Sequence, residues 1–241
     1  MATVLDRMTT GTVDVRPFGS LGHADHGWLN ARHHFSFSNY FDPQRMSWGK
    51  IRVWNDDEIA ARSGFPPHPH RDMEIITYVR TGAITHQDSM GNTGRTEAGD
   101  VQVMAAGTGV THAEYNLEDE TTTLFQIWIE TDRPGAAPSW GAKRFPKSDR
   151  AGAFVTLASG DGAADSLPIN ADARVMGATL AAGESAAIET GPERHIYLVP
   201  SGRVRVNGVE ANARDGVAVT GAGRVEVEAL EDAEVVLVDA R

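Results

Sequence analysis

Two short clusters of metal-ligating residues are the part of this sequence that could do chemistry. His68 and His70 stand two residues apart, and so do His112 and Glu114. Because residues i and i+2 of a β-strand point to the same face, each pair would present two ligands together, and two neighbouring strands could close a site of four. Three imidazoles and one carboxylate suit Fe, Cu, Ni, Mn or Zn and commonly leave a coordination position open. The spacing therefore predicts a transition-metal centre.

The composition limits which ligands and partners are available. The chain of 241 residues contains no cysteine, which excludes disulfides, thiolate nucleophiles and cysteine zinc sites. Its formal net charge of -11 argues against a direct nucleic-acid partner, because phosphate binding needs clustered Lys and Arg. Residues 1–8 lack the apolar core of a signal peptide, and no apolar run is long enough to span a bilayer. We expect a cytoplasmic protein with no membrane partner.

The elements that must position the ligands are short strands. Apolar and polar residues alternate between turns rich in Gly, Asp and Asn, which is typical of an all-β fold. In the first half, we expect strands at 75–80, 83–87, 101–104 and 124–130. In the second half, we expect them at 174–180, 196–199, 203–206, 217–220, 224–228 and 234–239.

Two successive β-barrels are expected from this pattern. The predicted limits are residues 1–133 for an N-terminal metal-binding barrel, 134–152 for a linker, and 153–241 for a C-terminal barrel. Only His195 lies in the second half, and one isolated histidine cannot assemble a metal site, so we expect the C-terminal barrel to be metal-free.

The two clusters resemble the signature motifs of the cupin superfamily. They are written Gly64-x3-His68-x-His70-x3-Glu74 and Gly107-x-Gly109-x2-His112-x-Glu114-x-Asn116. The second departs from the usual motif in having Gly107 where a proline is common. The fuller strings from His68 to Tyr78 and from His86 to Asn92 are similar to the pirin family, on its bacterial quercetinase-like branch. The resemblance implies a bicupin fold, two consecutive cupin-type β-barrels, each a double-stranded β-helix, with one metal in the N-terminal barrel.

The resemblance places the metal ligands on His68, His70, His112 and Glu114. Glu74 is a rival carboxylate, because many other cupins use the glutamate that follows His-x-His and because Glu74 would share the strand parity of His68 and His70. We favour Glu114 as the ligand. Glu74 and His86 are then candidates for supporting the ligands by hydrogen bonds.

The activity implied by the resemblance is that of an oxidoreductase, a quercetin 2,3-dioxygenase that cleaves the central ring of a flavonol-like aromatic substrate with O2 and releases carbon monoxide. Glu114 would be the catalytic residue that accepts the proton of the substrate hydroxyl. Fe(II) is the preferred metal because oxygen chemistry needs electron transfer, with Cu, Ni, Co, Mn or Zn as alternatives. Two other functions stay open: a non-enzymatic, metal- or redox-responsive binding module that modulates a protein partner, and a non-redox metal enzyme such as an isomerase.

Overall fold

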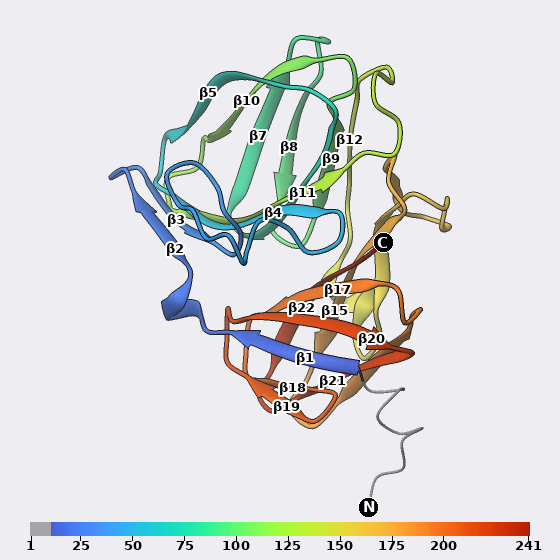
Figure 1. Ribbon diagram of the computed structural model, residues 1–241. Coiled ribbons are helices and arrows are strands. Elements are labelled where there is room, and N and C mark those ends of the chain that lie inside the picture. The colour runs from blue at the N-terminus through green and yellow to red at the C-terminus, as the bar shows by residue number, and fades with distance from the viewer. Residues whose placement is uncertain (1–10) are drawn as a thin grey trace, which may run out of the picture.

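Residues 11–241, which the computed structural model describes, form two β-sandwiches stacked on each other (Figure 1). In each sandwich a seven-stranded sheet is paired with a four-stranded sheet in a jelly-roll-like arrangement. The predicted all-β, two-unit fold is therefore confirmed. The helical elements in this range are two short 3-10 turns, η1 (Phe18–Ser20) and η2 (Lys147–Arg150). None of the helices that the structure describes has the length and apolar character needed to cross a membrane.

The N-terminal sandwich contains the strands β2 to β12. Its seven-stranded sheet has the order β12-β9-β6-β11-β4-β3-β2, and its four-stranded sheet has the order β5-β10-β7-β8. The larger sheet consists of β2 (Gly22–Asp25), β3 (Leu29–His33), β4 (Ile51–Ile59), β6 (Met73–Thr81), β9 (Val101–Ala105), β11 (Thr122–Glu130) and β12 (Ser139–Lys143). The smaller sheet consists of β5 (Ser63–His70), β7 (Ala83–Asp88), β8 (Thr93–Glu97) and β10 (Val110–Asn116).

The C-terminal sandwich repeats this plan. Its seven-stranded sheet has the order β1-β20-β17-β22-β15-β13-β14, and its four-stranded sheet has the order β16-β21-β18-β19. The larger sheet consists of β1 (Gly11–Arg16), β13 (Val155–Ser159), β14 (Leu167–Pro168), β15 (Ala173–Leu180), β17 (His195–Pro200), β20 (Gly216–Ala222) and β22 (Ala233–Ala240). The smaller sheet consists of β16 (Ser185–Glu189), β18 (Val204–Val206), β19 (Val209–Ala211) and β21 (Arg224–Ala229). Each strand expected from the sequence has a counterpart here.

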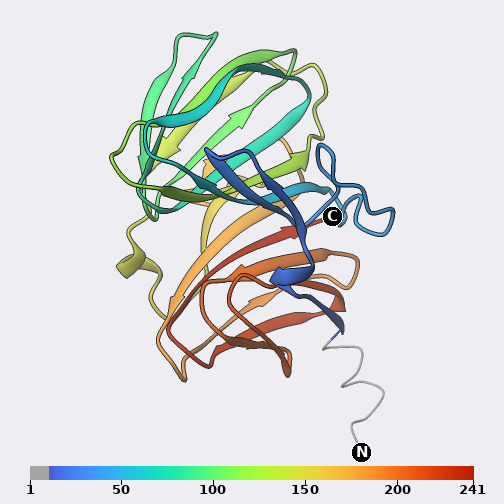
Figure 2. The ribbon, with the colours of Figure 1, turned by 90° about the vertical axis from the view of Figure 1, so that its left-hand side faces the viewer.

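Two strands belong to sheets in which the sequence did not place them. β1 pairs with β20, so the first described strand belongs to the C-terminal sandwich, and Figure 2 shows the chain passing from there to the other sandwich. β12 lies inside the expected linker but pairs with β9. The domain limits at residues 133 and 153 stay a prediction. Residues 1–10, which include the segment used to predict the location, lie outside the described residues.

The largest core cluster lies between the two seven-stranded sheets. It combines Trp54, Ile76 and Tyr78 of the N-terminal sandwich with Val175 and Tyr197 of the C-terminal one, among others. β6 is therefore buried on both faces, which explains why its sequence is a nearly continuous apolar run rather than a strict alternation. The outward face of this sheet holds the sandwiches together, and its inward face is left to build the interior.

Candidate metal centre

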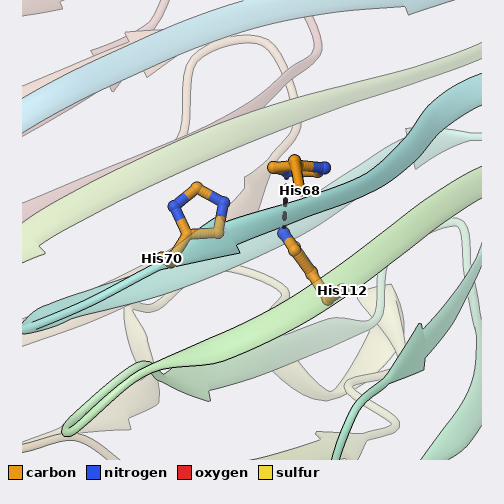
Figure 3. A group of neighbouring side chains, drawn as sticks. All are labelled: His68, His70 and His112. Atoms are coloured by element: carbon orange, nitrogen blue, oxygen red, sulfur yellow. Dashed lines mark hydrogen bonds between the residues drawn. The ribbon is translucent and has the colours of Figure 1, made fainter.

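Three imidazoles converge at the antiparallel pair of β5 and β10. The register sets His68 opposite His112 and His70 opposite Val110. Their ligating nitrogens all lie within 4.8 Å of one another, and Nε2 of His68 is 3.0 Å from Nε2 of His112 (Figure 3). Metal–nitrogen bonds of about 2.0–2.1 Å, roughly at right angles, separate two ligand nitrogens by about 3 Å. The three histidines therefore fit a single transition-metal ion.

The turn that leads into β10 depends on Gly107. Its φ of +45° lies in the left-handed region, and a Cβ at this position would come within 2.1 Å of the Ala136 carbonyl oxygen. Proline, which is common here in cupin motifs, has φ locked near −65° and could not adopt this conformation. The departure from the usual motif thus has a conformational reason and leaves His112 in place.

Glu114 lies one alternation further along β10 and is 2% exposed. Its carboxylate accepts hydrogen bonds from Gln102 Nε2 and Gln126 Nε2, each at 2.7 Å, and from the Thr77 hydroxyl at 3.3 Å. Glu114 belongs to a second group of close ligand atoms, with His86 and His112, rather than to the group of three histidines. His112 joins the two groups, and the role of Glu114 as fourth ligand stays a prediction.

His86 contacts the other side of the His112 ring. The two Nδ1 atoms are 3.4 Å apart, and His86 Nε2 lies 2.9 Å from Asp88 Oδ2. Burial alone would raise the pKa of Asp88, but hydrogen bonds from His86 and Asn92 outweigh it and lower that pKa. The Trp140 ring stacks on His86 at 4.8 Å. His86 is therefore placed where it can fix the orientation of His112, as residues behind a metal ligand commonly do.

Glu74 is not brought to this group. The sequence argument assumed one strand from His68 to Glu74, but β5 ends at His70, and a turn with Asp72 at φ +47° precedes β6. The assumption of shared parity is wrong for this reason. Ile76 lies on the same face of β6 as Glu74 and packs between the sandwiches. Ile75 lies on the opposite face and packs inside the N-terminal sandwich. Glu74 is buried at 1% exposure, and its Oε2 has no partner in the described chain.

Burial keeps the imidazoles of His70 and His112 neutral. It is the main cause that lowers the pKa of His70 to about 4, followed by the neighbouring His112 and His68. Burial and the neighbouring His68 and His86 lower the pKa of His112 to about 3. Neutral imidazole is the form that binds a metal. Protons would therefore compete with a metal at His70 and His112 only well below the ordinary histidine range.

A cavity of about 160 Å³ adjoins the imidazoles. Its walls combine apolar side chains with a few polar ones: Leu29, Ala31, His33, Phe37, Asn55, Asp57, Phe65, His68, His70, Glu114, Gln126 and Trp128. His70 also borders an open depression of about 370 Å³. A larger depression of about 670 Å³ lies around Arg194 and Arg174, but both guanidiniums are ion-paired with aspartates there. The cavity beside the histidines is thus the candidate ligand site.

Sequence reasoning missed several residues of this site: Asp57, Thr77, Asp88, Gln102, Gln126, Trp128 and Trp140. A signal for some of them exists, because Thr77, Gln102 and Gln126 each lie between two apolar or aromatic residues within a strand. A buried polar residue in such a position needs a hydrogen-bond partner, and here the shared partner is Glu114.

Comparisons with known proteins indicate the family and the fold. One family model that matches is described as Pirin, over residues 14–129, and another as Quercetinase C-terminal cupin domain, over residues 156–240. A pirin-like protein of Caulobacter vibrioides is 65% identical over 230 residues, 95% of this chain and 99% of the relative. The quercetin 2,3-dioxygenase of Escherichia coli K12 is 40% identical over 227 residues, 93% of this chain and 97% of the relative. A bacterial pirin of Escherichia coli, solved in complex with nickel(II), superposes with a TM-score of 0.89 at 38% identity, over 95% of this chain and 99% of that one.

Proposed function

The chain belongs to the pirin family, and from this premise we propose that it is a metal-dependent dioxygenase that cleaves flavonols such as quercetin with O2 and releases carbon monoxide. The observation that carries the proposal is the convergence of His68, His70 and His112 beside a partly aromatic cavity. Support also comes from the relative of Escherichia coli that is named quercetin 2,3-dioxygenase.

The metal would be held by the three histidines, with Glu114 as the proposed fourth ligand. When bound, a redox-active ion supplies Lewis acidity that makes the substrate hydroxyl more acidic and a route for electrons to O2. We propose Fe(II). Cu, Ni, Co and Mn remain alternatives, and nickel is present in the related pirin structure. Zinc would bind the same ligands but would not support electron transfer.

Glu114 is proposed as the base that takes the proton of the flavonol 3-hydroxyl. A carboxylate offers about four lone-pair sites. The two amides of Gln102 and Gln126 and the longer contact from Thr77 therefore leave about one lone pair, which could either bind the metal or, when Glu114 loosens from the metal, accept the hydroxyl proton. The same amides hold the carboxylate in a fixed position, which favours proton transfer along one direction. Phe37, Phe65 and Trp128 wall the cavity and exclude water from the reacting ring.

The test is an aerobic assay of metal-loaded protein in which quercetin consumption and carbon monoxide release are measured together. Glu114→Gln should lose activity by about a hundred- to ten-thousandfold at matched metal content, because an amide cannot accept the proton. Glu74→Gln is the matched variant, since Glu74 is an equally buried glutamate on the other face of the larger sheet, and it should retain most of the activity.

Two results would change the proposal. If Glu74→Gln is inactive and Glu114→Gln is active, the two carboxylates are reversed. If the wild type releases no carbon monoxide from any flavonol, the dioxygenase proposal fails and the binding-module alternative takes its place.

A further inference from the structure

Asp56 and Asp57 are neighbours on β4 with opposite surroundings. Asp56 faces the C-terminal sandwich, where Arg214 donates to its two carboxylate oxygens at 2.7 and 3.0 Å and Arg80 donates as well. Asp57 has the parity of Asn55 and lines the cavity beside the imidazoles. One carboxyl of the pair thus serves the contact between sandwiches, and the other lies against the ligand cavity.

The side chain of Asp57 has no protein partner that would explain its burial. It is 2% exposed, its Oδ1 is buried without a hydrogen-bond partner, and no ion pair joins it to another described residue. A buried ionised carboxylate is costly unless it is paired. Burial, followed by the negative charges of Asp56 and Glu114, raises the pKa of Asp57 well above its ordinary value, so the neutral acid is favoured. A neutral carboxyl offers one hydrogen-bond donor and an acceptor, and both are left for a ligand.

The size of the cavity indicates how much of a ligand Asp57 can contact. An apolar cavity of about 150 Å³ is known to hold a benzene ring, and the cavity here is about 160 Å³. One aromatic ring therefore fits, while the rest of a larger ligand extends outward. The open depression that shares His70 with the cavity offers a surface for that remainder.

We infer that Asp57 is a specificity-determining residue of this cavity, hydrogen-bonding a ring hydroxyl of the ligand other than the hydroxyl directed to the metal. The ligand class it selects is the polyhydroxylated flavonols. This inference rests on the proposed function, because it takes the ligand to be a flavonol. A buried, unpaired acid has a cost to folding, and a group that serves a ligand site commonly carries such a cost.

The experiment measures binding without turnover. Metal-loaded wild type, Asp57→Leu and Asp57→Asn are titrated in the absence of O2 with quercetin and with 3-hydroxyflavone, which lacks the additional ring hydroxyls. The wild type should prefer quercetin. Asp57→Leu should bind quercetin about five- to a hundredfold more weakly, because a ligand hydroxyl is left buried without a partner, and its affinity for 3-hydroxyflavone should not fall. Asp57→Asn should keep most of the preference, since an amide retains a donor and an acceptor.

Stability and a neighbouring control separate this role from a structural one. Asp57→Leu should unfold at the same temperature as the wild type or higher, because an apolar side chain replaces an unpaired acid. Asp56→Asn should lower the unfolding temperature by weakening the contacts with Arg80 and Arg214, yet keep the preference for quercetin.

Three outcomes would overturn the inference: an Asp57→Leu variant that keeps the preference, one that loses affinity for both ligands equally, or a wild type that shows no preference. The proposed function fails separately. A wild type that binds and prefers quercetin but releases no carbon monoxide on adding O2 would refute the dioxygenase reaction and leave the role of Asp57 intact.

Discussion

The two sandwiches have the same strand plan and opposite interiors. In the four-stranded sheets, the order β5-β10-β7-β8 matches β16-β21-β18-β19, so β10 corresponds to β21 and β5 to β16. Where β10 buries His112 and Glu114, β21 buries Val225 and Val227. The core inside the C-terminal sandwich is built from Ala, Val, Leu and Ile.

The difference shows that the same strand arrangement can enclose either a polar cluster or an apolar core. Which of the two forms depends on a few inward-facing positions of β10 and β21. A polar interior has to satisfy each buried group, and Thr77, Gln102 and Gln126 do this for Glu114. An apolar interior needs only complementary shapes. We propose that the N-terminal sandwich is specialised for a ligand site and the C-terminal one for stability.

Removing a ligand histidine should have the largest effect and should act on the N-terminal interior alone. We expect His112→Ala to lower metal affinity by more than about a hundredfold, since residues that merely support ligands already contribute roughly 10- to 100-fold. His195→Ala, the matched change in the C-terminal sandwich, should leave one metal per chain. Elemental analysis after dialysis measures both. Full occupancy in His112→Ala, or loss of metal in His195→Ala, would break the comparison.

Shortening a side chain in the apolar interior should lower stability and leave metal binding unchanged. Leu198 is fully buried in the C-terminal cluster. Leu198→Ala should lower the free energy of unfolding by roughly 2–5 kcal/mol through lost burial and the cavity left behind. Urea denaturation measures this loss, and a metal titration of the folded variant should give the wild-type affinity. A large drop in metal affinity would show that the two interiors are coupled.

Lowering the pH should reduce stability through the N-terminal interior, and this effect should be smaller than the two above. The pKa values of His70 and His112 are about 4 and 3 in the folded chain, against about 6.5 when unfolded. Between about pH 6.5 and pH 4, the unfolded chain binds protons that the folded chain does not, so the stability of the metal-free protein should decrease as the pH falls. Urea midpoints at pH 7 and pH 5 measure the decrease, which should be smaller in His112→Gln. An identical decrease in the two proteins would contradict this assignment.

The sequence predicted the local parts of this structure well. His68, His70 and His112 were found because a spacing of two is the period of a β-strand, and the strands were found because alternating runs end at turn residues. These are short-range patterns. Gly107 is a further local signal, since a glycine in place of the common proline indicates a left-handed turn.

The parts that escaped prediction depend on contacts between distant segments. The partners of Glu114 come from β6, β9 and β11, and nothing local to Gln102 or Gln126 indicates that the two amides face one carboxylate. Glu74 was misplaced because a turn at Asp72 resets the alternation between two strands that follow each other closely. Asp57 and Asp56 look alike in the sequence, and only the packing of the sandwiches distinguishes them.

The pairing of β1 with β20 has a consequence for how the molecule is made. The Phe18 N–H, just after β1, donates to Asp215, 197 residues further along the chain. A ribosome releases the N-terminal segment first, so β1 leaves the ribosome long before its partner strand β20 is synthesised. The strands β2 to β12 are all synthesised before β20. During synthesis β1 is an unpaired strand edge, the kind of surface that invites association with other chains. Closure of the C-terminal sandwich is thus a late and long-range event in biogenesis, and the half that carries the candidate metal centre is complete before it.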